Sequence, residues 1–144
     1  MNINFNAFNF EVIDINTHGI AEVTINQNGM NFSKRLVDDM GNPPYIRTLL
    51  EPEKRIFGIQ ACKQTDDQAL KFSKPRTEQK GGVTIACQPL MNVIRTLMGD
   101  SWDKKHRYRI AGKFFGDAKA TVFYLNTAEE HPLYKVTKGN HKTE

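Results

Sequence analysis

One order of sequence patterns occurs twice in this chain, and it constrains the fold more than any other feature. Residues 23–61 and 83–125 each contain an alternating apolar run, then apolar residues at helical spacing, then two further alternating runs. Alternation is the period of a half-buried strand, whereas a spacing of three to four residues is that of an amphipathic helix. Short identical stretches recur at equivalent places, with VTI at 23–25 and 83–85 and Met-Gly at 40–41 and 98–99. The order predicts one strand-helix-hairpin unit used twice, with both copies burying a common apolar face.

The first copy is bounded by turn and capping signals. The Asn-Gly pair in NQNG (26–29) predicts a tight hairpin turn. Ser33 can cap a short helix that ends at Gly41, and residues 45–50 and 55–61 then form a hairpin across EPEK. Because a helix of about two turns is not stable in isolation, we expect tertiary packing to hold it.

The second copy follows the same order with a longer helix. GGVTIAC (81–87) is predicted as a strand, residues 88–99 as a helix with Pro89 in its first turn, and residues 107–125 as a hairpin that turns at Gly116 and Asp117. The helix has one broad apolar arc, which we assign to the core: Leu90, Met91, Val93, Ile94, Leu97 and Met98.

The two copies together predict a mainly β (α+β) protein. Its first half spans residues 1–63 and includes alternating N-terminal strands rich in phenylalanine, with a candidate sheet edge at Phe5, Phe8 and Phe10. Residues 64–80 lose the periodicity and are predicted to be a polar linker before the second unit at 81–125. Residues 126–144 carry too few large apolar groups to offset the entropy of ordering them, so we expect a mobile tail.

Composition narrows the functional classes. The chain has 20 Lys and Arg against 16 Asp and Glu, and the resulting charge of +4 permits an anionic partner without requiring one. The two cysteines and four histidines form no metal-binding spacing, and the common catalytic and nucleotide-binding motifs are absent from the sequence. We therefore expect no enzyme, no metal and no cofactor.

The N-terminal residues indicate where the protein resides. They contain no basic segment followed by an apolar run, and nowhere do about 18 apolar residues follow one another. We therefore expect neither export nor membrane association, and a cytoplasmic location.

The stretch FSKRLVDDMG (32–41) resembles a segment of the AbrB/SpoVT and MraZ-like transcription factors, in which a short helix leads into a paired hairpin. The resemblance implies a small swapped-hairpin or double-psi-type barrel with basic residues on one face that meet DNA. Lys34 matches a basic position of that motif and Arg35 adds a charge beside it, whereas Ser33 and Val37 stand where the family usually has Pro and Arg.

A second candidate for nucleic-acid binding is the run KKHRYRIAGK (104–113). Strand alternation places Tyr108, Ile110 and Gly112 on one face and the basic residues of the strand on the other. The basic residues of the run, which could follow a phosphate backbone, are Lys104, Lys105, Arg107, Arg109 and Lys113. The alternative interpretation is an ordinary solvated sheet face, on which Lys104 and Lys105 balance the negative charge of the nearby Asp100 and Asp103.

Two functional hypotheses follow. The first is a small homodimeric DNA-binding regulator that contacts duplex DNA through the basic strand face. The second is a non-enzymatic protein-interaction module, for instance a phage or mobile-element protein that binds and inhibits a host factor. The sequence also leaves open whether Trp102 anchors a partner or covers the core.

Overall fold

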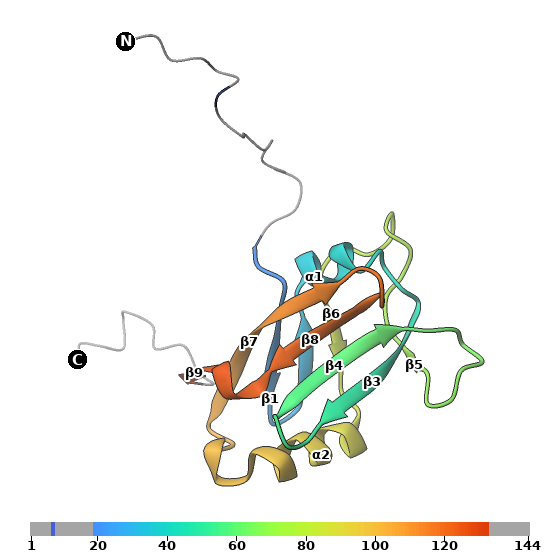
Figure 1. The fold of residues 1–144 in the computed structure, drawn as a ribbon. Coiled ribbons are helices and arrows are strands. Elements are labelled where there is room, and N and C mark those ends of the chain that lie inside the picture. Colours follow the sequence, from blue (N-terminus) through green and yellow to red (C-terminus); the bar gives the residue numbers. More distant parts are fainter. Residues whose placement is uncertain (1–6, 8–18, 133–144) are drawn as a thin grey trace, which may run out of the picture.

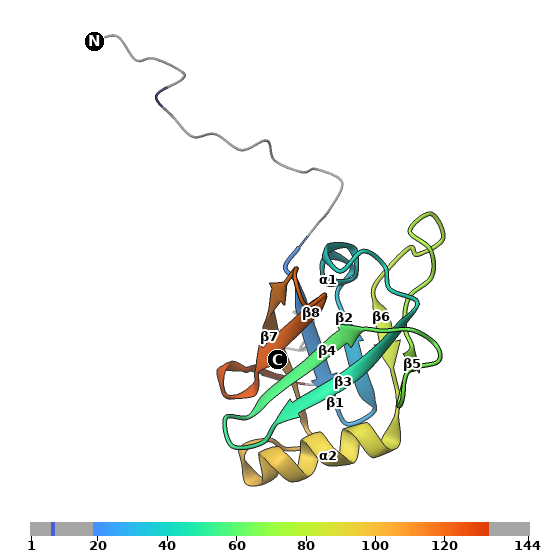
Figure 2. The ribbon, with the colours of Figure 1, turned by 45° about the vertical axis from the view of Figure 1, so that its right-hand side comes forward.

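Within residues 19–132, backbone pairing joins nine antiparallel strands into one strongly curled sheet, a half-barrel (Figures 1 and 2). The computed structural model describes residue 7 and residues 19–132. The strands are β1 (Glu22–Asn26), β2 (Gly29–Phe32), β3 (Tyr45–Glu51), β4 (Ile56–Ala61), β5 (Leu70–Lys71), β6 (Val83–Ile85), β7 (His106–Phe115), β8 (Ala120–Tyr124) and β9 (Glu129–Pro132). Their order is β5-β3-β4-β8-β7-β1-β2-β6, and β9 pairs with β7. The predicted mainly β class is therefore confirmed.

In the part of the chain that the structure describes, two α-helices lie at opposite ends of this sheet (Figures 1 and 2). They are α1 (Lys34–Asp39) and α2 (Gln88–Met98), and short 3-10 turns follow at η2 (Gly99–Ser101) and η3 (Leu125–Thr127). Among the described residues, no helix has the length and apolar character needed to cross a membrane.

Local hydrogen bonds explain where the first elements turn and begin. The Asn26 side chain accepts from the backbone N–H groups of Asn28 (2.7 Å) and Gly29 (3.1 Å), which closes the predicted β1-β2 turn. Ser33 caps α1, because its hydroxyl accepts from the backbone N–H of Leu36 at 3.3 Å. The chain then leaves the helix through Gly41, whose φ of +79° suits glycine.

The second predicted unit also has the expected order, as β6, α2 and the β7-β8 hairpin. Its helix buries only part of its apolar arc: Met91, Ile94 and Met98 are in the core. Val93, assigned to the core from sequence, is 47% exposed. The prediction was wrong for Val93 because an apolar arc fixes a direction around the helix axis but not how far the sheet reaches around it.

The sheet pairs the two units with each other, since β2 pairs with β6 and β4 pairs with β8. Their helices differ in length, with six residues in α1 and eleven in α2. The swapped-hairpin barrel and the true equivalence of the units therefore remain predictions.

Two predicted irregular segments contain sheet strands. Within the predicted linker 64–80, β5 pairs with the start of β3 and Phe72 is buried, with its N–H donating to the Pro44 carbonyl at 2.8 Å. Within the predicted tail, β9 pairs with β7 from Glu129 to Pro132. Backbone pairing thus orders short strands that lack an apolar pattern, whereas the division of the chain at 64 and 126 remains a prediction. The predicted N-terminal strands and residues 133–144 lie outside the described residues, except for Ala7.

Phenylalanine rings bind the curled sheet together from inside. Phe32 of β2 lies 5.4 Å from Phe72 and 6.1 Å from Phe123 of β8, measured between ring centroids. Phe123 also stacks on Phe57 of β4 at 5.8 Å. Rings from strands far apart in the sequence thus meet in one core, where aromatic pairs add about 0.5–1.5 kcal/mol each beyond area burial.

Ser33 offers a direct test of this arrangement. Besides capping α1, its hydroxyl accepts from the Glu22 N–H at 3.0 Å and donates to the Ile20 carbonyl at 2.7 Å. We expect Ser33→Ala to lower the free energy of unfolding by about 1–2 kcal/mol, because it removes the cap and both of these bonds. Urea denaturation measures the loss. Ser33→Thr keeps the hydroxyl and serves as control, so equal stability of the two variants would contradict the role given to Ser33.

Candidate functional site

The basic run of β7 has the predicted alternation. Tyr108 and Ile110 are buried, at 4% and 0% exposure, whereas Arg107 and Arg109 are half-buried on the other face. A carboxylate of a neighbouring strand and an aromatic ring of β7 itself contact basic side chains of this strand. Arg109 donates to Glu22 of β1 at 3.1 Å and lies opposite Glu129 of β9 in the sheet register. Lys113 stands over the Phe115 ring at 5.5 Å. Contacts within the chain therefore partly compensate the positive charge of β7.

Lys34 and Arg35, the two basic residues of α1 that the family resemblance singled out, each form an ion pair within the helix. Lys34 lies 3.2 Å from Asp38, and Arg35 lies 3.1 Å from Asp39, each four residues along α1. Ion pairs four residues apart on a helix contribute only about 0.3–0.5 kcal/mol, but they reduce the charge available to a phosphate. Lys104 and Lys105 are exposed and directly precede the first residue of β7. The seven predicted residues thus extend along the molecule and form no single cluster.

A polar network surrounds the start of β7. The Tyr108 hydroxyl accepts from the Asp103 N–H at 2.8 Å and donates to Glu130 of β9 at 3.1 Å. His106 Nδ1 lies 2.7 Å from Oδ1 of Asp103, and the Trp102 ring stacks on Tyr108 with 4.3 Å between centroids. Trp102 is half-buried and packs against the core, so it covers one end of the core while keeping an accessible edge.

These contacts shift three pKa values. The hydrogen bond to Asp103 raises the pKa of His106, and the same bond lowers the pKa of Asp103. Burial raises the pKa of the Tyr108 hydroxyl, which donates to Glu130. The network therefore favours a charged His106 beside a charged Asp103.

Three residues of this network could offer atoms to a metal. The candidate ligand atoms of Asp103, His106 and Glu130 all lie within 4.8 Å of one another. One nitrogen and two oxygens are donors that zinc accepts. However, Oδ1 of Asp103 already receives the Lys105 N–H at 2.8 Å as well as His106. Hydrogen bonding within the chain accounts for the cluster, and we assign no metal to it.

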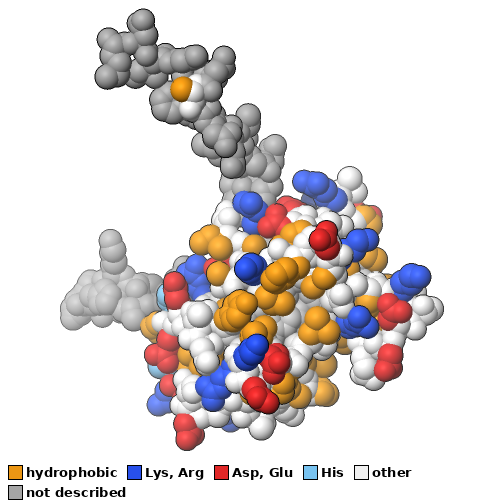
Figure 3. All heavy atoms as spheres, in the orientation of Figure 1, with side chains coloured by type: hydrophobic (Ala, Val, Ile, Leu, Met, Phe, Trp, Pro, Cys, Tyr) orange, Lys and Arg blue, Asp and Glu red, His pale blue; other side chains and the backbone are white. Residues whose placement is uncertain are grey.

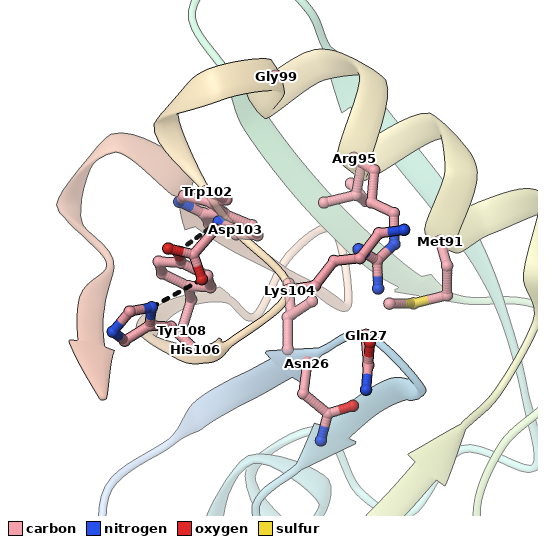
Figure 4. A pocket seen from close by; sticks show the side chains of 12 residues that line it. Asn26, Gln27, Met91, Arg95, Gly99, Trp102, Asp103, Lys104, His106 and Tyr108 are labelled. Atoms are coloured by element: carbon pink, nitrogen blue, oxygen red, sulfur yellow. Dashed lines mark hydrogen bonds and ion pairs between the residues drawn. The ribbon is translucent and has the colours of Figure 1, made fainter. Parts of the chain in front are cut away.

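A hollow of about 180 Å³ lies beside this network, between α2 and the β1-β2 turn (Figure 4). Its apolar floor is buried: Ile25, Met91, Ile94 and Tyr108. Its rim carries polar and charged side chains: Asn26, Gln27, Arg95, Asp103, Lys104 and His106. We call it the α2 pocket. Among the rim residues, only Lys104 was a predicted site residue. Asp103 and His106 lie beside it in the sequence, whereas Asn26, Gln27 and Arg95 come from two other segments that share no motif with it.

A second hollow, of about 280 Å³, lies between β3 and the first turns of α2. Its lining is mostly apolar: Thr48, Leu49, Leu50, Phe57, Gln68, Leu70, Cys87, Pro89, Leu90, Val93 and Ile94. An adjoining hollow continues it along α2 past Leu50, Val93 and Leu97. We call the two together the edge groove.

Further apolar side chains are exposed on the outer face of the sheet, where Figure 3 shows them gathered across the middle of the molecule. Phe115, Tyr124 and Leu49 are each about two-fifths exposed, at 42%, 44% and 39%. The register places these residues along β7, β8 and β3. This surface is thus more apolar than the strand alternation alone indicated.

Comparisons with protein families, with curated proteins and with solved structures give no significant match to this chain. The resemblance to the AbrB/SpoVT and MraZ-like factors therefore stays a prediction, and the function has to be argued from the geometry.

The His106–Asp103 pair gives a pH dependence with a definite sign. Since the pKa of His106 is raised, the pair stabilises the fold fully below the ordinary histidine pKa, and that contribution is lost as pH rises through the raised value. NMR titration of the His106 ring should show a pKa above the ordinary value, and Asp103→Asn should lower it. Glu129→Gln, which alters the contact of His131 instead, is the matched control. An unchanged His106 pKa in Asp103→Asn would refute the assignment.

Proposed function

We propose that this protein is a non-enzymatic protein-interaction module that binds an extended segment of a partner protein along β3. The observation that carries the proposal is an uncovered strand edge directly beside an apolar groove. β5 pairs with β3 only at Tyr45 and Ile46, and no other described strand lies on that edge. The remainder of β3 can accept an additional strand.

The hydrogen-bonding pattern indicates which backbone groups are available. The Cys62 N–H donates to the Tyr45 carbonyl, so residues in step with Tyr45 face β4. In an antiparallel pair the intervening residues point the other way. The N–H and C=O groups of Thr48 and Leu50 are therefore directed to the uncovered edge, where an extended backbone could satisfy them.

The edge groove supplies matching contacts for side chains. Leu50, Leu90 and Val93 line it, and Val93 and Leu50 are 47% and 38% exposed. Alternate residues of a strand point to the same side, so an added strand would direct every second side chain toward this apolar lining. We infer that the partner segment carries apolar residues at alternate positions, and that backbone pairing supplies affinity while the groove supplies selectivity.

Thr48→Pro tests this proposal. The substitution removes an outward N–H and places a ring on the edge, whereas the hydrogen bonds between β3 and β4 are kept. Peptides selected from a linear library on the wild-type protein should show alternating apolar residues and should bind Thr48→Pro at least tenfold more weakly. Thr48→Ala keeps the N–H and should bind them as the wild type does. Fluorescence anisotropy of labelled peptides measures each affinity.

Two results would overturn the proposal. One is a library from which no peptide is enriched, and the other is a set of peptides that bind Thr48→Pro and wild type equally. Circular dichroism of each variant establishes that the fold is retained. If the occupant is a second copy of this chain, as the sequence-based homodimer implies, light scattering should detect a dimer in the wild type that Thr48→Pro dissociates.

Duplex DNA is the second candidate partner, favoured by the exposed Lys104 and Lys105 at the entry to β7 and by Arg107 on its solvent face. The ion pairs of Lys34, Arg35 and Arg109 weigh against a DNA surface, because they neutralise three of the seven candidate cations.

The salt dependence of binding separates the two candidates. If the β7 face follows phosphates, Arg107→Ala/Arg109→Ala should weaken binding to every duplex. The slope of log K against log salt should then fall by roughly 0.9 for each phosphate that the variant no longer neutralises. Lys63→Ala, an exposed lysine beyond the end of β4, is the control. Fluorescence titration with labelled duplex provides the measurement. No measurable affinity at about 50 mM salt would exclude the DNA candidate.

A further inference from the structure

Apart from Ile94, the residues that line the α2 pocket have no part in the proposed binding along β3. The pocket shares only Ile94 with the lining of the edge groove. Its floor is closed by buried apolar side chains, and the stacked rings of Trp102 and Tyr108 form one wall. At about 180 Å³ it exceeds the roughly 150 Å³ apolar cavity that holds a benzene ring. The floor can therefore accept a ring or a branched aliphatic group.

Two cations converge on the mouth of the pocket from different elements. Figure 4 shows Arg95, from α2, and Lys104, from the segment before β7, extending toward the same space above Met91. Neither cation forms an ion pair with any carboxylate of the described residues. Like charges that share a half-enclosed space repel each other, so an anion between them would relieve an unfavourable interaction.

The acidic groups near the pocket are directed elsewhere. Asp103 is the only carboxylate in its lining, and it pairs with His106 (Figure 4) and accepts from the Lys105 N–H. Glu130, on the far side of Tyr108, accepts from the Tyr108 hydroxyl. Both carboxylates therefore have partners, and neither is positioned by a bond to Arg95 or Lys104.

The helix dipole explains only one of the two cations. A positive side chain in the last turn of a helix is favoured by the partial negative charge there, and Arg95 occupies that turn of α2. Lys104 lies outside the helix, so the dipole gives no reason for it to lean over the pocket. The amides of Asn26 and Gln27 on the opposite rim add hydrogen-bonding groups that could orient a ligand.

We propose that the α2 pocket binds a small organic anion, with a ring or branched apolar body on the floor and a phosphate or carboxylate group held by Arg95 and Lys104. This site is separate from the proposed strand edge. Binding requires both parts of the ligand, because the apolar floor supplies burial while the cations supply charge-assisted hydrogen bonds.

Trp102 makes the proposal directly testable, since it is the single tryptophan of the chain and lines the pocket. Phenyl phosphate is the anionic probe, and its titration should change Trp102 emission in a saturable manner. Inorganic phosphate, which lacks the ring, and benzyl alcohol, which lacks the charge, should each bind at least tenfold more weakly. Benzoate should bind if carboxylates are accepted as well as phosphates, and phenyl phosphate alone should bind if they are not.

Arg95→Gln and Lys104→Gln should each weaken phenyl phosphate binding by about tenfold or more, the reduction expected when one charge-assisted hydrogen bond is removed. Lys63→Gln removes an exposed lysine beyond β4 and should leave binding unchanged. Thr48→Pro should also leave it unchanged, which separates failure of this proposal from failure of the strand-edge function. Lack of saturation with phenyl phosphate, equal binding of inorganic phosphate, or undiminished binding by both glutamine variants would overturn the assignment.

Discussion

Backbone hydrogen bonds along both edges of β7 hold the two halves of this structure together. One edge pairs with β1, while the other pairs first with β9 and then with β8. The same strand delivers Tyr108 and Ile110 to the core and carries Arg107 and Arg109 outside it. The polar network, the α2 pocket and the basic face all take their positions from this one strand. A change that breaks its pairing would disturb all three at once.

The distribution of charge matters more here than its total. A net charge of +4 describes the whole chain, whereas a binding surface needs uncompensated charge in one place. Along α1 and in the middle of β7, basic side chains meet carboxylates within 3.2 Å. Among the described residues, Arg95 and Lys104 have no such carboxylate partner, and Arg95 belongs to no sequence motif that would select it. Local compensation thus divides the basic side chains that the structure describes into those paired within the fold and those available to a ligand.

Local chemistry could be predicted from the sequence, and long-range placement could not. The Asn26 turn, the Ser33 cap and the alternation of Tyr108 and Ile110 depend on neighbouring residues, so their patterns identified them. β5 and β9 contain few apolar residues and owe their order to strands distant in sequence. Val93 belongs to an apolar arc, yet periodicity does not distinguish a side chain covered by the sheet from one that lines an open groove. The α2 pocket could not be predicted from the sequence because its rim combines residues of three separate segments.

The brevity of β5 also bears on the colloidal behaviour of the protein. Two paired residues cover the beginning of β3 and leave the rest of that strand uncovered by any described strand. Natural sheets usually shield such edges with charge, proline or a covering loop, because an open edge beside apolar side chains recruits other chains. Here Leu49, Leu50 and Val93 accompany the open edge. A molecule whose β3 edge is free is therefore prone to pair edge to edge with other copies and to aggregate. A strand bound at that edge would prevent this aggregation at high protein concentration.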